Sequence, residues 1–204
     1  MDGIRDATWF HGTKASRFPS WLVPPPPVPG EELRVPHTAI FFTKDLNDAR
    51  RVGPNVCSVR LTDQARILDA TQASPGSESL RQLLIENELA RSCIYTRSKE
   101  VWTAAWRSGE VLRYATEDQR VLLHIAEHAA KLAAKLHADE RTMLVVTQHN
   151  WTRGWIEHVV ISAAKLGFNA LHGFEIDRHS GGPDRAVSWL AVTEAQAVMA
   201  PSWL

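Results

Sequence analysis

Three consecutive residues near the start of the chain, His11, Gly12 and Thr13, have the chemistry of a ligand site. An imidazole and a hydroxyl supply hydrogen-bonding groups, and glycine lets a backbone pass close to a bound molecule. The triplet follows Trp9 and Phe10, an apolar pair typical of the end of a β-strand. An ordinary strand-to-helix turn has the same residue types, and spacing alone favours that turn.

A second chemical pattern, HIAEH, occupies residues 124–128. It matches H-x-x-E-H, in which His124 and His128 lie one helical turn apart and can bind zinc while Glu127 acts as general base. Such a zinc metallopeptidase needs a third ligand, and no motif marks one. Because the chain has nine histidines, a chance pair at this spacing is unsurprising. We therefore expect no metal and keep the zinc enzyme as a minor alternative.

The first third of the chain predicts strands around one short helix. Segments rich in β-branched and aromatic residues or with period-two alternation indicate strands. They occur at residues 38–43, 55–61 and 65–70. Residues 44–53 predict a helix, with Asp45 as its N-cap and Gly53 just past its end. The proline-rich residues 23–30 predict an extended loop.

The middle of the chain, from about residue 77 to 167, predicts helices. Apolar residues recur three and four positions apart there, and Thr116 with Gln119 matches a capping box. The helices are expected at residues 77–90, 116–136 and 152–167, the last one ended by Gly167. Two closing strands are expected at residues 168–176 and 185–193, joined by a turn-rich segment.

Strands first, helices in the middle and strands last predict an α+β fold whose terminal segments share a sheet or a sandwich. With 204 residues, 44% hydrophobic content and eight Trp, the chain can bury one substantial core, so we expect a single domain over residues 1–204. Lys plus Arg equals Asp plus Glu at 23 each, so no overall field favours nucleic acid or an anionic membrane.

The expected compartment is the cytoplasm. The first residues lack a signal-peptide pattern, and no apolar stretch approaches the roughly 20 residues of a membrane span. Cys57 and Cys93 share no spacing typical of a disulfide framework or a zinc site, which fits a reducing environment.

The order of these pieces resembles the ADP-ribosyltransferase superfamily of bacterial toxins and poly(ADP-ribose) polymerase-like enzymes. The resemblance spans Thr8 to Gln196 and rests on HGT after a first strand, FFT-x-D-x-x-x-A about thirty residues later, and LGF-N-A near the end. It implies a split β-sandwich core with the helical segment, about 77–167, inside it. It also implies cleavage of the nicotinamide–ribose bond of NAD and transfer of a single ADP-ribose to an unidentified acceptor. We expect a protein or nucleic acid as acceptor, with a small molecule also open.

The resemblance further implies roles for individual residues. Gly12 would meet the nicotinamide carboxamide through its backbone, and His11 would hydrogen-bond the adenosine-side ribose. Phe41 or Phe42 would stack on the nicotinamide where many relatives carry Tyr, and strand alternation lets one of them face the ligand. Thr43 would contact the nicotinamide ribose or cap the next helix. The expected NAD-binding residues are His11, Gly12, Thr13, Phe41, Phe42 and Thr43.

The third catalytic position departs from the family's pattern. Relatives usually place a glutamate at the start of the last strand, where this chain has Ser188. Glu175 and Asp184 are the candidates for a substitute carboxylate. The expected catalytic residues are therefore His11, Phe42, Glu175 and Ser188. Mono-ADP-ribosyltransferases of the His-Tyr-hydrophobic type suggest that the reaction can proceed without the carboxylate, and a relative that binds NAD without transfer is the second hypothesis.

Overall fold

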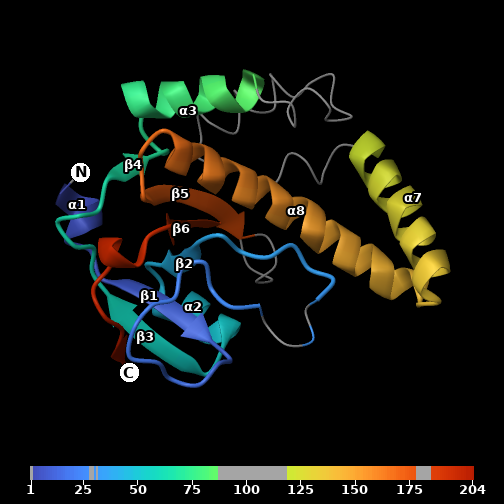
Figure 1. Ribbon diagram of the computed structural model, residues 1–204, viewed down its shortest axis with the longest axis horizontal. Helices are drawn as coiled ribbons and strands as arrows, with labels where there is room; N and C mark the ends of the chain where they lie inside the picture. Colours follow the sequence, from blue (N-terminus) through green and yellow to red (C-terminus); the bar gives the residue numbers. More distant parts are fainter. Residues whose placement is uncertain (1, 28–29, 31, 87–118, 178–184) are drawn as a thin grey trace.

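The structure, a computed structural model, describes residues 2–27, 30, 32–86, 119–177 and 185–204 (Figure 1). Its helices are α1 (Asp2–Arg5), α2 (Leu46–Val52), α3 (Pro75–Glu86), α7 (Gln119–Leu136) and α8 (Glu140–Lys165), with a 3-10 turn at Ala195–Ala197. Its strands are β1 (Trp9–Thr13), β2 (Ile40–Thr43), β3 (Asn55–Val59), β4 (Ile67–Asp69), β5 (Ala170–Asp177), β6 (Arg185–Val192) and β7 (Ser202–Trp203).

These strands form one mixed sheet in the order β4-β5-β6-β2-β1-β3-β7. Among the strand pairs that the structure describes, only β4–β5 is parallel. The expected pair of closing strands is confirmed, because β5 and β6 pair from Ala170↔Val192 to Asp177↔Arg185. The expected sharing of a sheet by the two ends of the chain is also confirmed, since β6 lies beside β2. The fold is therefore α+β.

The sheet is curved around an inner core. Strands β1 and β5 are separated by β2 and β6, so in a flat sheet they would lie roughly 14 Å apart. The ring centroids of Trp9 on β1 and His172 on β5 are nevertheless only 5.7 Å apart. This inner core includes the buried side chains of Ile4, Trp9, Trp21, Ile40, Phe42, Ile67, Leu190 and Val192.

The outer face of β4, β5 and β6 is covered by α3 and α8, which lie above these strands in Figure 1. Period-two alternation decides which side chains point there. Along β6, Leu190 and Val192 join the inner core, whereas Trp189 and Ala191 pack with Leu80 of α3 and residues of α8. The outer core also holds Leu84, Ile125, Val159, Val160 and Leu171.

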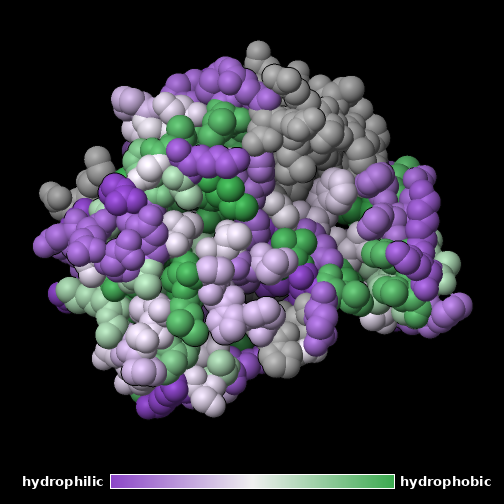
Figure 2. Space-filling view, in the orientation of Figure 1, coloured by the Kyte–Doolittle hydropathy of each residue, from purple (hydrophilic) through white to green (hydrophobic). Residues whose placement is uncertain are grey.

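Helices α7 and α8 form a hairpin beside the sheet (Figure 1). Ala129 and Ala133 of α7 pack with Met143 of α8 in a small core of their own. On the outside, Figure 2 shows hydrophobic residues among hydrophilic ones over this hairpin, where Leu123 and Val145 are exposed.

Two local expectations are corrected by the structure, and one lies outside the residues that it describes. His11, Gly12 and Thr13 continue β1 instead of forming a turn. Helix α8 begins at Glu140, twelve residues before the expected start at 152, because Asp139 caps it by accepting from the backbone N–H of Thr142 and α7 covers its first turns. The expected capping residue Thr116 lies outside the described residues, as do residues 87–118 as a whole.

Candidate functional site

Strand β1 separates from β2 after a single residue pair. Phe10 pairs with Thr43, whereas β1 makes five pairs with β3. We call the region beyond this pair, bordered by His11, Gly12 and Phe41, the β1–β2 split. Strands normally stay paired until one of them ends or bends away. Because β1 and β2 both continue beyond their last pair, backbone groups of these two strands face the split.

The backbone of Gly12 faces this split. Val56 of β3 accepts a hydrogen bond from Leu204 N at 3.0 Å, so Val56 directs its backbone toward β7. Successive residues of an antiparallel strand direct their N–H and C=O to opposite sides. Cys57 therefore faces β1, and its partner His11 faces β3. Gly12, one residue on, directs its N–H and C=O toward β2.

His11 bridges the split with its side chain. The Phe41 carbonyl lies 2.9 Å from His11 Nδ1, so Nδ1 carries the hydrogen and Nε2 is left as an acceptor. The ring packs between Trp21 and Phe42, with centroids 5.4 and 5.7 Å away. Burial lowers the pKa of His11, and the bond to the Phe41 carbonyl only partly opposes this. The imidazole is therefore neutral at pH 7.

Gly12 also lets α2 pack against β1. A Cβ at Gly12 would lie 1.7 Å from the carbonyl oxygen of Ala49. The helix itself starts as the sequence predicts, because the Asp45 side chain accepts from Asn47 N at 2.8 Å. It ends at Gly53, whose φ of −173° is extended and whose added Cβ would lie 2.2 Å from the carbonyl carbon of Thr13.

The two adjacent phenylalanines lie on opposite faces of β2. Phe42 is 3% exposed and belongs to the inner core, with its ring 5.2 Å from that of Trp21. Phe41 is only partly buried and packs against the outer core. Its ring lies 4.9 Å from His37 and 6.3 Å from Trp189. Phe41 is thus the one of the two whose ring has accessible surface beside the split.

The two expected threonines bind backbone groups in turns. Thr13 Oγ1 accepts from Ala15 N at 3.0 Å, and Thr43 Oγ1 accepts from Asp45 N at 3.1 Å. Thr43 thus closes a turn just before α2, whose N-cap is Asp45.

Ser188 lies apart from His11 and Gly12. It lines an open hollow of about 390 Å³ together with Phe10, Lys44 and the first residues of α2, at the opposite end of β2 from the split. Ser188 pairs with Phe174 in the sheet. Glu175 pairs with Val187, the residue before Ser188. Asp184 lies outside the described residues.

A histidine–glutamate pair beside Phe41 was not predicted from the sequence. Glu157 of α8 is 4% exposed, and its Oε1 lies 2.6 Å from His37 Nδ1. Its Oε2 accepts from the Thr38 backbone N at 2.8 Å and from Thr38 Oγ1 at 2.5 Å. Burial raises the pKa of Glu157, but the hydrogen bonds from His37 and Thr38 lower it below its ordinary value. The partners are about 120 residues apart in sequence, so no local signal reveals them.

A second unpredicted pair links β4 and β5. His172 Nδ1 lies 2.9 Å from Asp69 Oδ1, which also accepts from Thr71 Oγ1 at 2.6 Å. His172 is 7% exposed, and its Nε2 has no hydrogen-bond partner among the described residues. Burial lowers the pKa of His172 despite the bond to Asp69.

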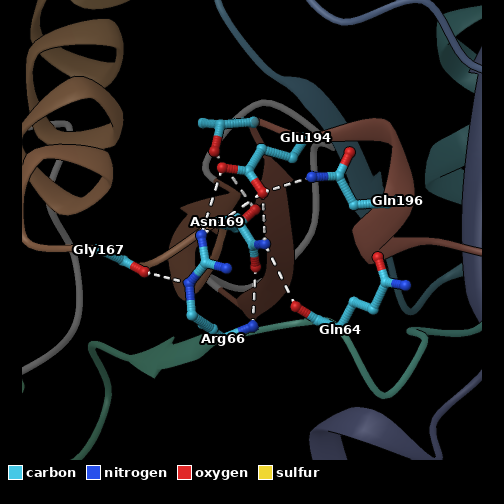
Figure 3. Close-up of polar contacts among 7 residues, drawn as sticks. Gln64, Arg66, Gly167, Asn169, Glu194 and Gln196 are labelled. Atoms are coloured by element: carbon cyan, nitrogen blue, oxygen red, sulfur yellow. Dashed lines mark hydrogen bonds and ion pairs between the residues drawn. The ribbon is translucent and has the colours of Figure 1, made fainter.

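The LGF-N-A motif contains a structural anchor, drawn in Figure 3. Asn169 is 1% exposed, and its side chain accepts from Arg66 N at 2.7 Å. Its amide donates to Glu194 Oε2 at 2.8 Å and to the Gln64 carbonyl at 3.3 Å. Asn169 thus ties together the segments before β4, before β5 and after β6.

The HIAEH segment is helical, as predicted, and lies within α7. The His124 ring packs edge-on against Trp151 of α8 at 5.4 Å, while Glu127 and His128 are exposed. Across the described parts of the chain, no three His, Cys, Asp or Glu residues come together in a group that could hold a metal ion.

Comparisons with known proteins identify no family. No protein-family model matches the chain, and no curated protein does. Among solved structures, a chain from the crystal structure of an anti-CRISPR protein matches 98% of this chain and 98% of its own length, with a TM-score of 0.44 and 12% sequence identity. Within the described residues, no helix is both long and apolar enough to cross a membrane.

Proposed function

We propose that the protein is an NAD-dependent mono-ADP-ribosyltransferase with the split β-sandwich core of that superfamily. It would bind NAD at the β1–β2 split, cleave the nicotinamide–ribose bond and transfer ADP-ribose to a protein or nucleic-acid acceptor. The observation that supports this most directly is the split itself, where Gly12 directs its backbone toward β2 beyond the last β1–β2 pair.

The chemistry of the split suits a nicotinamide. Its carboxamide has one donor and one acceptor group, as does a peptide unit, so it can pair with the Gly12 backbone as a neighbouring strand would. Phe41 offers a partly exposed ring for stacking at the same place. His11, neutral and with Nε2 as an acceptor, suits a ribose hydroxyl that donates.

The proposal places Phe41, and not Phe42, against the nicotinamide. Phe42 is enclosed by Trp21 and His11 in the inner core. In this assignment Phe42 supports the His11 ring from behind. Breaking the nicotinamide–ribose bond develops positive charge on the ribose, which rigid binding of both leaving group and sugar promotes.

Calorimetry with NAD tests this assignment. Phe41→Leu should weaken NAD binding about two- to tenfold, because an aromatic stacking contact contributes roughly 0.5–1.5 kcal/mol beyond burial. Phe10→Leu, on β1 at the hollow, is the matched control and should bind NAD as the parent does. If both variants bind equally well, NAD does not stack on Phe41.

A non-catalytic NAD-binding protein is the second candidate, because Ser188 stands where relatives carry a glutamate. Incubation of the protein with labelled NAD and a cell lysate, followed by separation of protein from nucleic acid, distinguishes the two. Label on a macromolecule supports transfer and identifies the acceptor class. Retention of intact NAD on the protein alone supports binding without transfer.

A further inference from the structure

The proposed transfer requires a base for the proton that the acceptor loses on reaction. Among the side chains that the structure describes, those expected from the sequence do not supply one on the Phe41 side of β2. His11 packs on the inner side between Trp21 and Phe42, and Ser188 lies at the far end of β2. Beside Phe41, the described residues include the imidazole of His37, which is hydrogen-bonded to a buried carboxylate.

The geometry of this pair fixes which nitrogen of the imidazole faces the carboxylate. Glu157 Oε1 lies 2.6 Å from His37 Nδ1, and the other carboxylate oxygen is held by Thr38. An ionised carboxylate can only accept, so Nδ1 carries the hydrogen, and in the neutral ring Nε2 is the nitrogen with the lone pair. The Glu157 side chain is 5% exposed and the His37 side chain 29% exposed. The carboxylate is therefore enclosed, while the imidazole reaches solvent.

The imidazole also lies where the proposed reaction takes place. The rings of His37 and Phe41 are 4.9 Å apart and inclined at 55°. The carbonyl of the same Phe41 accepts the hydrogen bond from His11 across the split. A nicotinamide stacked on Phe41 would thus have His37 at the edge of its site.

We propose that His37 is the general base of the transfer and that Glu157 is its positioning residue; this inference rests on the proposed function. The acceptor's O–H or N–H gives its proton to His37 Nε2, and the freed electron pair forms the new bond to the ribose anomeric carbon. The bond from that carbon to nicotinamide breaks, and nicotinamide leaves as a neutral molecule with the bonding electrons. The Glu157 carboxylate stabilises the imidazolium that results.

A purely structural role would be to fasten the strap, which we define as residues 33–38, to α8. The strap is fastened independently of His37. Asn150 accepts from Val35 N at 2.9 Å and donates to the Leu33 carbonyl at 2.6 Å. Arg153 donates to the Val35 carbonyl at 3.1 Å. Asn150 therefore provides a control that loosens the strap without touching the pair.

Single-turnover transfer and NAD calorimetry on His37→Ala test the proposal. We expect the transfer rate to fall about 10²- to 10³-fold, as loss of a general base does, with NAD affinity within about threefold of the parent. Added imidazole should restore at least about tenfold of the rate, and less in the His37→Ala, Glu157→Gln double variant, where nothing positions the added base. Asn150→Ala should keep the parent rate within about threefold.

The outcomes separate the two proposals. A parent that neither binds nor cleaves NAD overturns the proposed function and this inference together. A parent that transfers ADP-ribose while His37→Ala reacts equally fast overturns the inference alone. So does a His37→Ala variant that loses rate without rescue by imidazole, or an Asn150→Ala variant that loses as much rate, because both results indicate a structural role.

Discussion

Gly12 lies between two features of the molecule, the β1–β2 split and helix α2. Its backbone edge faces the β1–β2 split, and its Cα packs against the carbonyl of Ala49 in α2. A side chain at this position would displace α2 before it met any ligand. Ligand binding alone therefore does not account for the glycine at this position.

Gly12→Ala should consequently lower the free energy of unfolding by about 3 kcal/mol, at the upper end for an overpacked site, because the new Cβ would lie 1.7 Å from a backbone oxygen. Chemical denaturation measures the loss. Gly154→Ala in α8 is the control, since an added Cβ there meets nothing within 4 Å. That variant should gain roughly 0.5–1 kcal/mol from helix propensity. Equal stability of Gly12→Ala and the parent would contradict the packing of α2.

The ionisable groups of the interior predict how stability depends on pH. Burial lowers the pKa of His11, His158 and His172 below the ordinary 6.5. As the pH falls, the unfolded chain therefore takes up protons before the folded protein does. The contribution of these neutral rings to the free energy of unfolding is complete above pH 6.5 and is lost as the pH falls below it. The pKa of Glu157 in the folded protein lies below its ordinary 4.5. Glu157 therefore adds a second loss of stability, which begins as the pH falls below 4.5.

Urea unfolding at pH 8, 6, 5 and 4 should show this decline in two steps. His172→Gln should reduce the first step, because it removes one buried ring whose protonation favours unfolding. His128→Gln, at an exposed position on α7, should leave both steps unchanged. A parent whose stability is constant from pH 8 to 5 would rule out the histidine contribution.

At the scale of elements, Asn169 links segments that the sheet alone does not connect. Asn169→Ala should lower the free energy of unfolding by about 3 kcal/mol, because it removes three hydrogen bonds and leaves the N–H of Arg66 without this partner. Thermal unfolding with Gln196→Ala as control measures the effect. Gln196 is exposed and makes one bond to the same Glu194, so its loss should cost less than about 1 kcal/mol. Similar losses in both variants would contradict the anchoring role.

The elements that could be predicted from sequence carry local signals. Asp45 and Gly53 mark the two ends of α2 because their capping hydrogen bonds, from Asn47 N to Asp45 and from Gly53 N to the Ala49 carbonyl, span no more than four residues. Alternating apolar residues identified β5 and β6, which pair from Ala170↔Val192 to Asp177↔Arg185. The start of α8 was missed because packing on α7 supports residues 140–151, whose Val and Thr have modest helix propensity.

The candidate site was only partly predictable for the same reason. His11, Gly12 and Phe41 are found together at the split, but the pairing that ends there joins strands about thirty residues apart. His37 and Glu157 meet across about 120 residues, and neither belongs to a motif. The division between Phe41 and Phe42 follows from which face the inner core covers, which alternation alone does not decide.

At the scale of the whole molecule, the two ends of the chain close the inner core together. Trp21 donates to the Met199 carbonyl at 2.9 Å, and Trp203 donates to the Phe18 carbonyl at 2.9 Å. Trp21 lies against both His11 and Phe42. The position of the His11 ring therefore depends on residues from the first 21 and the last six of the chain.

The place of β2 between β1 and β6 has a consequence for how the chain is made. Thr43 pairs with Trp189, nearly 150 residues later, so β2 lacks one neighbour until most of the chain has left the ribosome. At about 5–20 residues per second, that interval lasts roughly 7 to 29 seconds. During it the apolar Ile40–Phe42 segment has an unpaired edge, which is the kind of edge on which chains associate. Folding of this sheet is thus limited by the arrival of its last long strand.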